Sequence, residues 1–154
     1  MKLLHASLTK QLRRALLPLA MLATVHAQAG LIVDDNILDT EILGGRLLVV
    51  ETGTVTATFL GSNAGYRNYL FLDTPNSATP GVIFNKYTPK GTTANLGSFA
   101  SGTELIFRLF VSNTGNNFYT GDASRNPDQL AHANAITSLE NGEYITRVGF
   151  EDLW

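Results

Sequence analysis

The sequence predicts an all-β fold, a single antiparallel β-sandwich of the jelly-roll kind. Short apolar segments recur after residue 30. In Thr54–Leu60, for example, Val55, Ala57 and Phe59 face one way and threonines face the other. Gly, Pro, Asn and Asp separate these segments and favour turns between them. No stretch after residue 30 has the 3.6-residue apolar period of an amphipathic helix, so the pattern indicates strands throughout.

Residues 1–29 are predicted to be a secretory signal peptide that is cleaved from the domain. The apolar segment Ala15–Val25 ends in the small-x-small site Ala27-Gln28-Ala29, and it follows a cationic region that contains Lys2, Lys10, Arg13 and Arg14. A transmembrane anchor is the alternative, but the apolar run is about 11 residues and a span needs roughly 20. Arg13-Arg14 also raises the twin-arginine route, although the flanking residues fit ordinary secretion better. We therefore expect a secreted, periplasmic or cell-surface protein.

Removing residues 1–29 from the 154-residue chain leaves 125 residues, 30–154, which is one domain by length. Four of the eleven Lys and Arg residues leave with the leader and none of the thirteen Asp and Glu residues do, so seven basic and thirteen acidic residues give a net charge of −6. An acidic surface repels nucleic acid and anionic lipid. The chain has no cysteine, which excludes disulfides, a thiol nucleophile and a Cys-ligated zinc.

Seven segments are predicted as strands, in chain order. Leu31–Leu38 is a short strand or an irregular entry, and the others are Arg46–Val50, Thr54–Leu60, Tyr66–Asp73, Gly81–Phe84, Glu104–Ser112 and Glu143–Phe150. Leu105–Val111 is apolar on both faces apart from Arg108, which predicts a central strand covered on both sides. Pro127 favours a single helical turn over Asp128–Ala135. The predicted core comprises Phe59, Phe71, Phe107, Leu109, Val111, Val148 and Phe150.

The last third of the chain resembles a family of bacterial secreted proteins catalogued as domain of unknown function 4114, in the variant carried by exoproteins with a PEP-CTERM sorting tail. The matching segments are Phe59–Tyr66, Leu96–Gly115, Tyr119–Asp128, Leu130–Ala133 and Val148–Leu153. In that family Gly149-Phe-Glu-Asp-Leu153 runs into a Gly-rich loop, an Asp-rich run and a final strand. The resemblance therefore implies that this sandwich lacks its final strand and has an unpaired strand edge beside Glu143–Phe150.

Glu151 and Asp152 are the candidate metal ligands. The resemblance implies a calcium site in complete relatives, where the missing acidic run supplies further oxygens, since Ca²⁺ takes six to eight. The alternative is a structural role, with both carboxylates accepting bonds from Arg108, Arg147 or loop amides. A second acidic cluster, Asp34-Asp35-Asn36 with Asp39, lacks the glycine and distal glutamate of a calcium loop and is interpreted as a solvated turn.

The polar loop Asn113–Ala133 offers the candidate ligand contacts Phe118, Tyr119 and Arg125, which we expect to be exposed. A structural role for the loop is the alternative, because its Asn, Asp and Ser side chains can bond their own backbone. His132 is the only histidine after the leader, and no nucleophile elbow or second histidine accompanies it. No acid motif links Glu51, Glu104, Glu140 and Glu143 into a glycosidase pair.

The sequence therefore predicts a non-catalytic exported module for adhesion or for association with extracellular matrix or envelope. Its partner would be a polysaccharide or an envelope protein. A carbohydrate-binding module that uses aromatic side chains on a sheet face or loop is the alternative, and a secreted hydrolase ranks last. No cofactor is required, with calcium as the one candidate. Oligomeric state and ligand identity are open.

Overall fold

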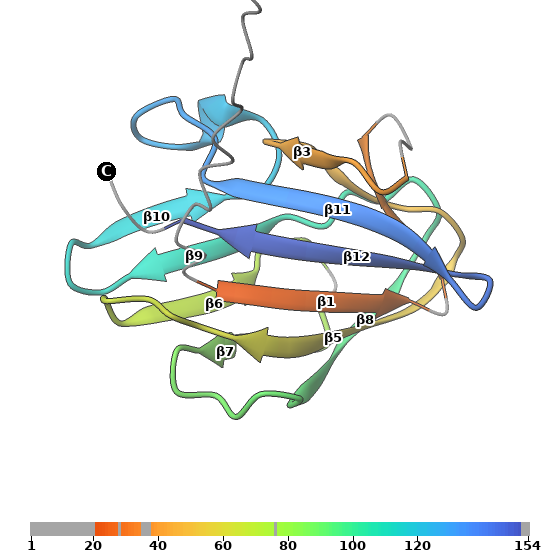
Figure 1. Ribbon diagram of the computed structural model, residues 1–154, viewed down its shortest axis with the longest axis horizontal. Helices are drawn as coiled ribbons and strands as arrows, with labels where there is room; N and C mark the ends of the chain where they lie inside the picture. The colour runs from red at the N-terminus through yellow and green to blue at the C-terminus, as the bar shows by residue number, and fades with distance from the viewer. Residues whose placement is uncertain (1–20, 28, 35–37, 76, 152–154) are drawn as a thin grey trace, which may run out of the picture.

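The structure is a computed structural model that describes residues 21–27, 29–34, 38–75 and 77–151. These residues contain twelve strands and one 3₁₀ turn, and every strand pair is antiparallel. The prediction of an all-β, antiparallel sandwich is confirmed. Two main sheets lie face to face, with the larger one in front in Figure 1.

The six-stranded sheet has the order β3-β11-β12-β1-β5-β8 (Figure 1). Its strands are β1 (Met21–Ala27), β3 (Glu41–Leu43), β5 (Gly53–Gly61), β8 (Thr93–Phe99), β11 (Ala133–Glu140) and β12 (Glu143–Phe150). β11 and β12 form a hairpin whose turn contains Asn141 and Gly142, both at positive φ. β5 has the predicted alternation, with Val55, Ala57 and Phe59 buried.

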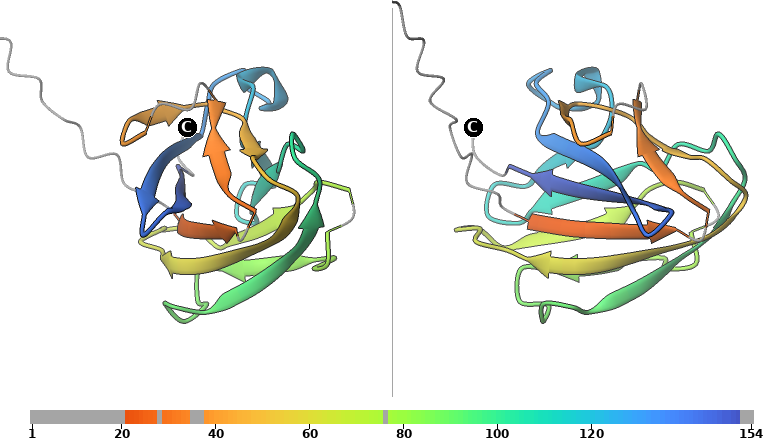
Figure 2. Two further views of the ribbon diagram at one scale, coloured as in Figure 1. Left: turned by 90° about the vertical axis from the view of Figure 1, so that its right-hand side faces the viewer. Right: turned by 45° about the vertical axis from the view of Figure 1, so that its right-hand side comes forward.

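The four-stranded sheet has the order β10-β9-β6-β7. Its strands are β6 (Asn68–Leu72), β7 (Val82–Asn85), β9 (Phe107–Val111) and β10 (Asn116–Tyr119). A third, two-stranded sheet pairs β2 (Leu31–Val33) with β4 (Leu47–Val49). Figure 2 shows how the sheets enclose one interior. The interior is filled by side chains from all three sheets, among them Leu31, Val49, Phe59, Phe84, Leu109 and Val148.

A chain of hydrogen bonds ties β2 to the β11–β12 hairpin inside this core. The Val33 N–H donates to Thr137 Oγ1 at 3.0 Å, Thr137 and Thr146 share a 3.0 Å bond, and Thr146 Oγ1–H donates to the Leu31 carbonyl. Because the single Thr146 proton goes to Leu31, Thr137 is the donor in the middle bond. Both hydroxyls are thus satisfied although both side chains are buried.

The predicted core is correct at six of its seven positions, and Phe71 is the exception. Leu70 and Leu72 of β6 face the interior, so Phe71 between them lies half-buried on the opposite face. The same alternation on β9 buries Phe107 and Leu109 and turns Arg108 outward. The prediction that β9 is covered on both sides is therefore wrong, since one of its faces looks out of the sandwich.

The structure also contains elements that the sequence pattern did not predict. β3, β8, β10 and β11 all lie in stretches interpreted as loop or left unassigned. The expected helical turn at Asp128–Ala135 is wrong, because the 3₁₀ turn occupies Ala123–Arg125 and β11 already begins at Ala133.

β1 lies inside the predicted leader, yet it is paired along its length on both sides. It pairs with β12 from Met21↔Phe150 to His26↔Ile145, and with β5 from Leu22↔Gly61 to Ala27↔Val55. The expected unpaired edge beside Glu143–Phe150 is therefore wrong in the full chain, since β12 has β11 on one side and β1 on the other. Cleavage after Ala29 would remove β1 from the middle of the sheet.

Candidate functional site

Aromatic side chains cross the outer face of the four-stranded sheet in rows. In the first row Tyr119 of β10 pairs with Arg108 of β9, Arg108 pairs with Phe71 of β6, and Phe71 pairs with Val82 of β7. Val82 is exposed and the other three side chains are half-buried. A row across four strands places these side chains side by side, about 4.8 Å apart from strand to strand.

The second row lies two residues away on β10, β9 and β6 and three residues away on β7, where the register shifts. Asn117, Phe110, Tyr69 and Asn85 follow one another across β10, β9, β6 and β7. The ring centroids of Tyr69 and Phe110 are 6.4 Å apart at an interplanar angle of 32°. Each of these side chains is half-buried, while their strand neighbours Leu70, Leu109 and Phe118 face the core. The two rows together form the outer aromatic face, defined by Tyr69, Phe71, Arg108, Phe110, Asn117 and Tyr119.

Arg108 fixes the geometry in the middle of the outer aromatic face. Its Nε donates to Asp73 Oδ2 at 2.7 Å and its Nη1 donates to Asn117 Oδ1 at 3.1 Å. Its guanidinium carbon lies 4.2 Å from the centroid of the Phe71 ring, within the range of a cation–π contact. The arginine thus joins both rows, since its guanidinium lies over the Phe71 ring of the first row and bonds Asn117 of the second.

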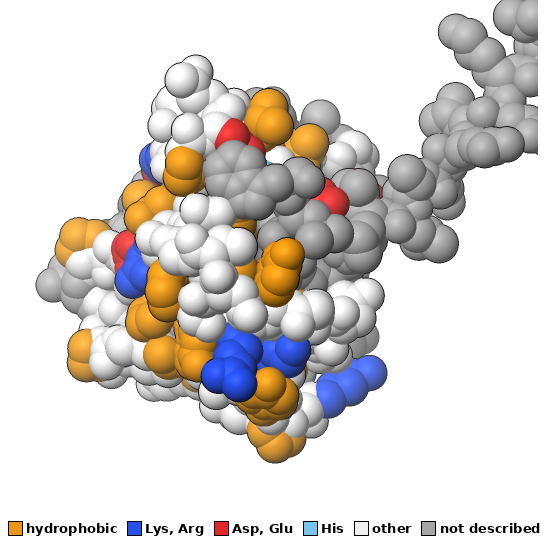
Figure 3. All heavy atoms as spheres, turned by 90° about the vertical axis from the view of Figure 1, so that its left-hand side faces the viewer, with side chains coloured by type: hydrophobic (Ala, Val, Ile, Leu, Met, Phe, Trp, Pro, Cys, Tyr) orange, Lys and Arg blue, Asp and Glu red, His pale blue; other side chains and the backbone are white. Residues whose placement is uncertain are grey.

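The face therefore combines flat apolar rings with hydrogen-bonding groups on one rigid sheet. Such a surface suits a ligand that is itself flat and apolar on one side and carries polar groups at its rim. A sugar ring has this character, because its C–H groups can cover an aromatic ring while its hydroxyls reach amides and guanidinium. Figure 3 views the sandwich from the left-hand side of Figure 1, at one end of the sheets, where hydrophobic side chains lie beside Lys and Arg side chains.

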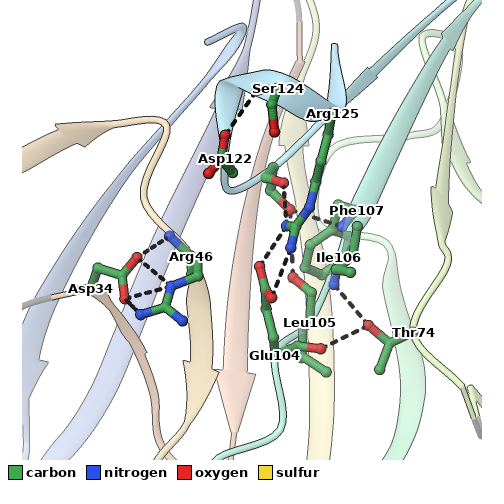
Figure 4. Close-up of polar contacts among 11 residues, drawn as sticks. Asp34, Arg46, Thr74, Glu104, Leu105, Ile106, Phe107, Asp122, Ser124 and Arg125 are labelled. Carbon is green, nitrogen blue, oxygen red and sulfur yellow. Dashed lines mark hydrogen bonds and ion pairs between the residues drawn. The ribbon is translucent and has the colours of Figure 1, made fainter. Parts of the chain in front are cut away.

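The loop before β11 is held by an ion pair between Glu104 and Arg125 (Figure 4). Arg125 Nη1 donates to Glu104 Oε1 at 2.6 Å, Nη2 donates to Oε2 at 3.0 Å, and Nη1 also reaches the Thr120 carbonyl at 3.1 Å. The hydrogen bond to Glu104 raises the pKa of Arg125 above its ordinary value. Gly121, at φ +85°, leaves room for the pair, because a Cβ there would collide with Arg125 Nη1 and lie 2.8 Å from Glu104 Oε1.

His132 also serves this loop. Its Nε2 lies 2.8 Å from Asp128 Oδ2, and its ring lies 4.0 Å, centroid to centroid, from the ring of Phe118. His132 and Phe118 are both buried. Burial tends to raise the pKa of Asp128, but hydrogen bonds from Leu130 N–H and His132, with the charge of His132, outweigh it and lower that pKa.

The three predicted ligand contacts therefore have different positions. Phe118 is fully buried, so the expectation that it is exposed is wrong; it faces inward on β10 because Tyr119 next to it faces outward. Arg125 is engaged with Glu104. Tyr119 alone of the three lies on the outer aromatic face. The sequence pattern did not assign its partners to a binding face: Phe71 was predicted in the core, and Tyr69, Arg108 and Phe110 were not named as ligand contacts. The alternation in β6 and β9 nevertheless shows that one set of side chains must face away from the core.

The candidate metal ligands do not form a cluster within the described residues. The Glu151 N–H donates to the His132 carbonyl at 2.8 Å, and Asp152 lies outside the described residues. Asp34 accepts from Arg46 Nε at 3.1 and 3.0 Å (Figure 4), and this hydrogen bond and the attraction of the two charges raise the pKa of Arg46. The described part of the chain holds no group of three or more His, Asp and Glu side chains able to bind a metal ion.

Of the four glutamates considered for catalysis, Glu140 and Glu143 are register partners at the turn end of the β11–β12 hairpin. Glu104 is paired with Arg125 and Glu140 with Arg147, while Glu51 and Glu143 are exposed.

The fold is thus an antiparallel β-sandwich whose four-stranded sheet carries an aromatic outer face. Comparison of the chain with protein-family models, with curated proteins and with solved structures gave no match. Among the described residues no helix is long and apolar enough to cross a membrane.

Proposed function

We propose that this protein is a non-catalytic exported module that associates with extracellular matrix or envelope by binding a polysaccharide on the outer aromatic face. The single observation that carries the proposal is the cross-strand arrangement of Tyr69, Phe71, Phe110 and Tyr119 around Arg108. Half-buried rings supply apolar area that a sugar can cover, and Arg108 and Asn117 offer directional hydrogen bonds beside them. The resemblance to the secreted 4114 family and the predicted leader support an exported location.

Binding to polysaccharides tests the proposal. The protein without residues 1–29 and the full chain are incubated with a panel of insoluble polysaccharides and with a glycan array, in calcium and in chelator. We expect at least one polysaccharide to be bound with a measurable Kd. The calcium arm also tests the separate prediction that Glu151 and Asp152 contribute to a calcium site.

Matched variants show whether the outer aromatic face is responsible. Tyr69→Ala and Phe110→Ala each remove one ring from the second row, and we expect each to weaken binding about tenfold or more, as for other aromatic anchors. Tyr144→Ala is the control, because Tyr144 is a half-buried tyrosine on β12 in the other sheet. Circular dichroism and thermal melts check that each variant folds.

Three results would contradict the proposal. One is that no polysaccharide is bound. Another is that Tyr69→Ala and Phe110→Ala bind as well as the Tyr144→Ala control. The third is the release of reducing ends from a bound polysaccharide, which would assign the protein to the hydrolases instead.

A further inference from the structure

β1 stands between two strands that run parallel to each other. It is antiparallel to β5 and antiparallel to β12, so β5 and β12 have the same direction and lie two strand spacings apart, roughly 9–10 Å. At that distance the backbone groups of β5 cannot reach those of β12. A strand must therefore lie between them, and the registers of β5 and β12 are set for one that runs antiparallel to both, as β1 does.

A strand in the position of β1 forms hydrogen bonds on both sides, unlike a strand at a sheet edge. Six residues of β1 pair with β12 and six pair with β5, so an occupant satisfies two ladders at once, whereas a strand at an edge satisfies one. Without an occupant, N–H and C=O groups on both neighbours lose their partners, and a buried backbone group without a partner is destabilising. We call this position the β5–β12 slot.

Buried side chains line the floor of the slot and limit the size of the side chains that fit. Ala23 lies in register between Phe59 of β5 and Val148 of β12, and all three are buried. Two residues further along the strand, residue 25 is in register with Ala57 and Thr146, which are also buried. A small side chain is therefore needed at the first of these positions, because Phe59 and Val148 already fill the row.

β1 is joined to the rest of the fold on one side through Gln28 to Gly30. The predicted cleavage after Ala29 falls in this connection, so processing would separate β1 from strands β2 to β12. The slot would then be empty in the exported protein while its two walls and its floor remained in the chain.

We propose that the β5–β12 slot is a strand-acceptor site, which an extended segment of a second polypeptide fills in the exported protein by β-strand addition. The acceptor chemistry specifies the occupant. It runs antiparallel to both β5 and β12, contains no proline within about six residues, and has a side chain no larger than alanine opposite Phe59 and Val148. Filling of the slot by a second polypeptide rests on the proposed cleavage after Ala29, because only cleavage removes β1. The experiment below tests the slot itself and does not require export.

The experiment starts from the folded full chain. A protease recognition loop is inserted at Gln28, the protein is produced without export, and the folded protein is nicked there so that β1 is no longer covalently attached. A fluorescent peptide of residues 20–29 is then added in excess, before and after nicking. Fluorescence anisotropy measures exchange, and hydrogen exchange measures the protection of the β5 and β12 amides.

We expect the labelled peptide to replace β1 and to keep the β5 and β12 amides protected. Peptides with Ala23→Phe or Val25→Pro are the controls, and we expect each to bind about tenfold or more weakly, because the first overfills the row and the second removes a ladder donor.

Four outcomes would overturn the inference. The nicked protein could lose residues 1–27 and keep its protection and melting temperature without peptide, which means that the sheet closes by itself. It could aggregate whether or not peptide is present. It could retain its own β1 and take up no labelled peptide, so that the strand is not exchangeable. Both altered peptides could bind as well as the original. Binding of polysaccharide is scored separately on the same samples, so failure of the slot leaves the outer aromatic face untouched.

Discussion

At the scale of single residues, phenylalanine has two roles in the four-stranded sheet. Phe107 and Phe118 are buried between the sheets at 2% and 0% exposure. Phe71 and Phe110 lie on the outer face of the same strands or of their neighbours, where Arg108 and Tyr69 contact their rings. The chemistry of the residue is the same in each case, and only its odd or even place along the strand decides between core and surface.

This difference predicts unequal effects on stability. Phe107→Ala should lower the free energy of unfolding by about 3–5 kcal/mol, because it leaves a cavity in the core. Phe71→Ala should cost clearly less, because solvent fills the space that its half-buried ring leaves. Urea unfolding of both variants measures the difference. Equal losses would show that the outer face is packed as tightly as the interior.

Protonation of Asp128 at low pH should lower the stability of the fold at the loop before β11. Its pKa is lower in the folded chain than its ordinary value of about 3.9. The carboxylate therefore stabilises the fold above that ordinary value, and the contribution is lost as the pH falls through the lower folded pKa. We expect wild type to melt higher than Asp128→Asn near neutral pH, with the gap closing as the pH drops below about 4. A gap that persists to the lowest pH at which both proteins fold would contradict this.

At the scale of elements, β2 depends on a polar contact within an apolar core. Three residues of β2 would pack on the β11–β12 hairpin in many registers, but the bonds of Leu31 and Val33 to Thr146 and Thr137 select one. Buried polar bonds of this kind fix geometry because leaving one unmade is costly.

Replacing one hydroxyl tests this. Thr146→Val keeps the shape of the side chain but leaves the Leu31 carbonyl without this donor and Thr137 without its acceptor, so we expect a loss of about 1–3 kcal/mol. Thr54→Val is the control, since Thr54 shares a bond with Ser98 in an exposed position. Equal melting temperatures for the two variants would show that the buried network adds no stability.

Strands whose own residues alternate strongly were predictable, as β5, β6 and β9 show. β8 was not, because Asn95 and Gly97 interrupt its apolar residues and a bulge shifts its register against β5. β10 was hidden inside a polar loop, since Phe118 is the only fully buried residue of its four. The fold class thus follows from local patterns, but these interrupted strands do not.

The outer aromatic face depends on information that no single segment contains. The alternation in β6 shows that Tyr69 and Phe71 share a side, but only the register with β9 places Phe110 next to Tyr69 and Arg108 next to Phe71. Register between strands separated by a long loop is set by the packing of the whole sandwich. The β5–β12 slot was not predictable either, because residues 21–27, which form β1, were assigned to the leader.

At the scale of the whole molecule, the folded full chain hides its own predicted cleavage point. Ala29 is fully buried, its carbonyl accepts from Glu51 N–H at 2.7 Å, and the carbonyl of Gly30 accepts from Val50 N–H at 2.8 Å. A peptidase needs this segment extended and accessible. Cleavage after Ala29 must therefore come before folding.

Processing can be followed directly. We expect exported protein to begin at Gly30 by N-terminal sequencing, and we expect purified, folded full chain to resist the same peptidase until denaturant is added. Exported protein that begins at Met1 would refute the cleavage. Rapid cutting of the folded chain would show that the segment around Ala29 opens readily.

The place of β1 also has a consequence for the order of events in time. Met21 leaves the ribosome long before its partner Phe150 on β12. The six-stranded sheet cannot be completed around β1 until β12 has also been synthesised, and contacts so distant in sequence form slowly. Until then the backbone groups of β1 that pair with β12 in the folded sheet stay without those partners.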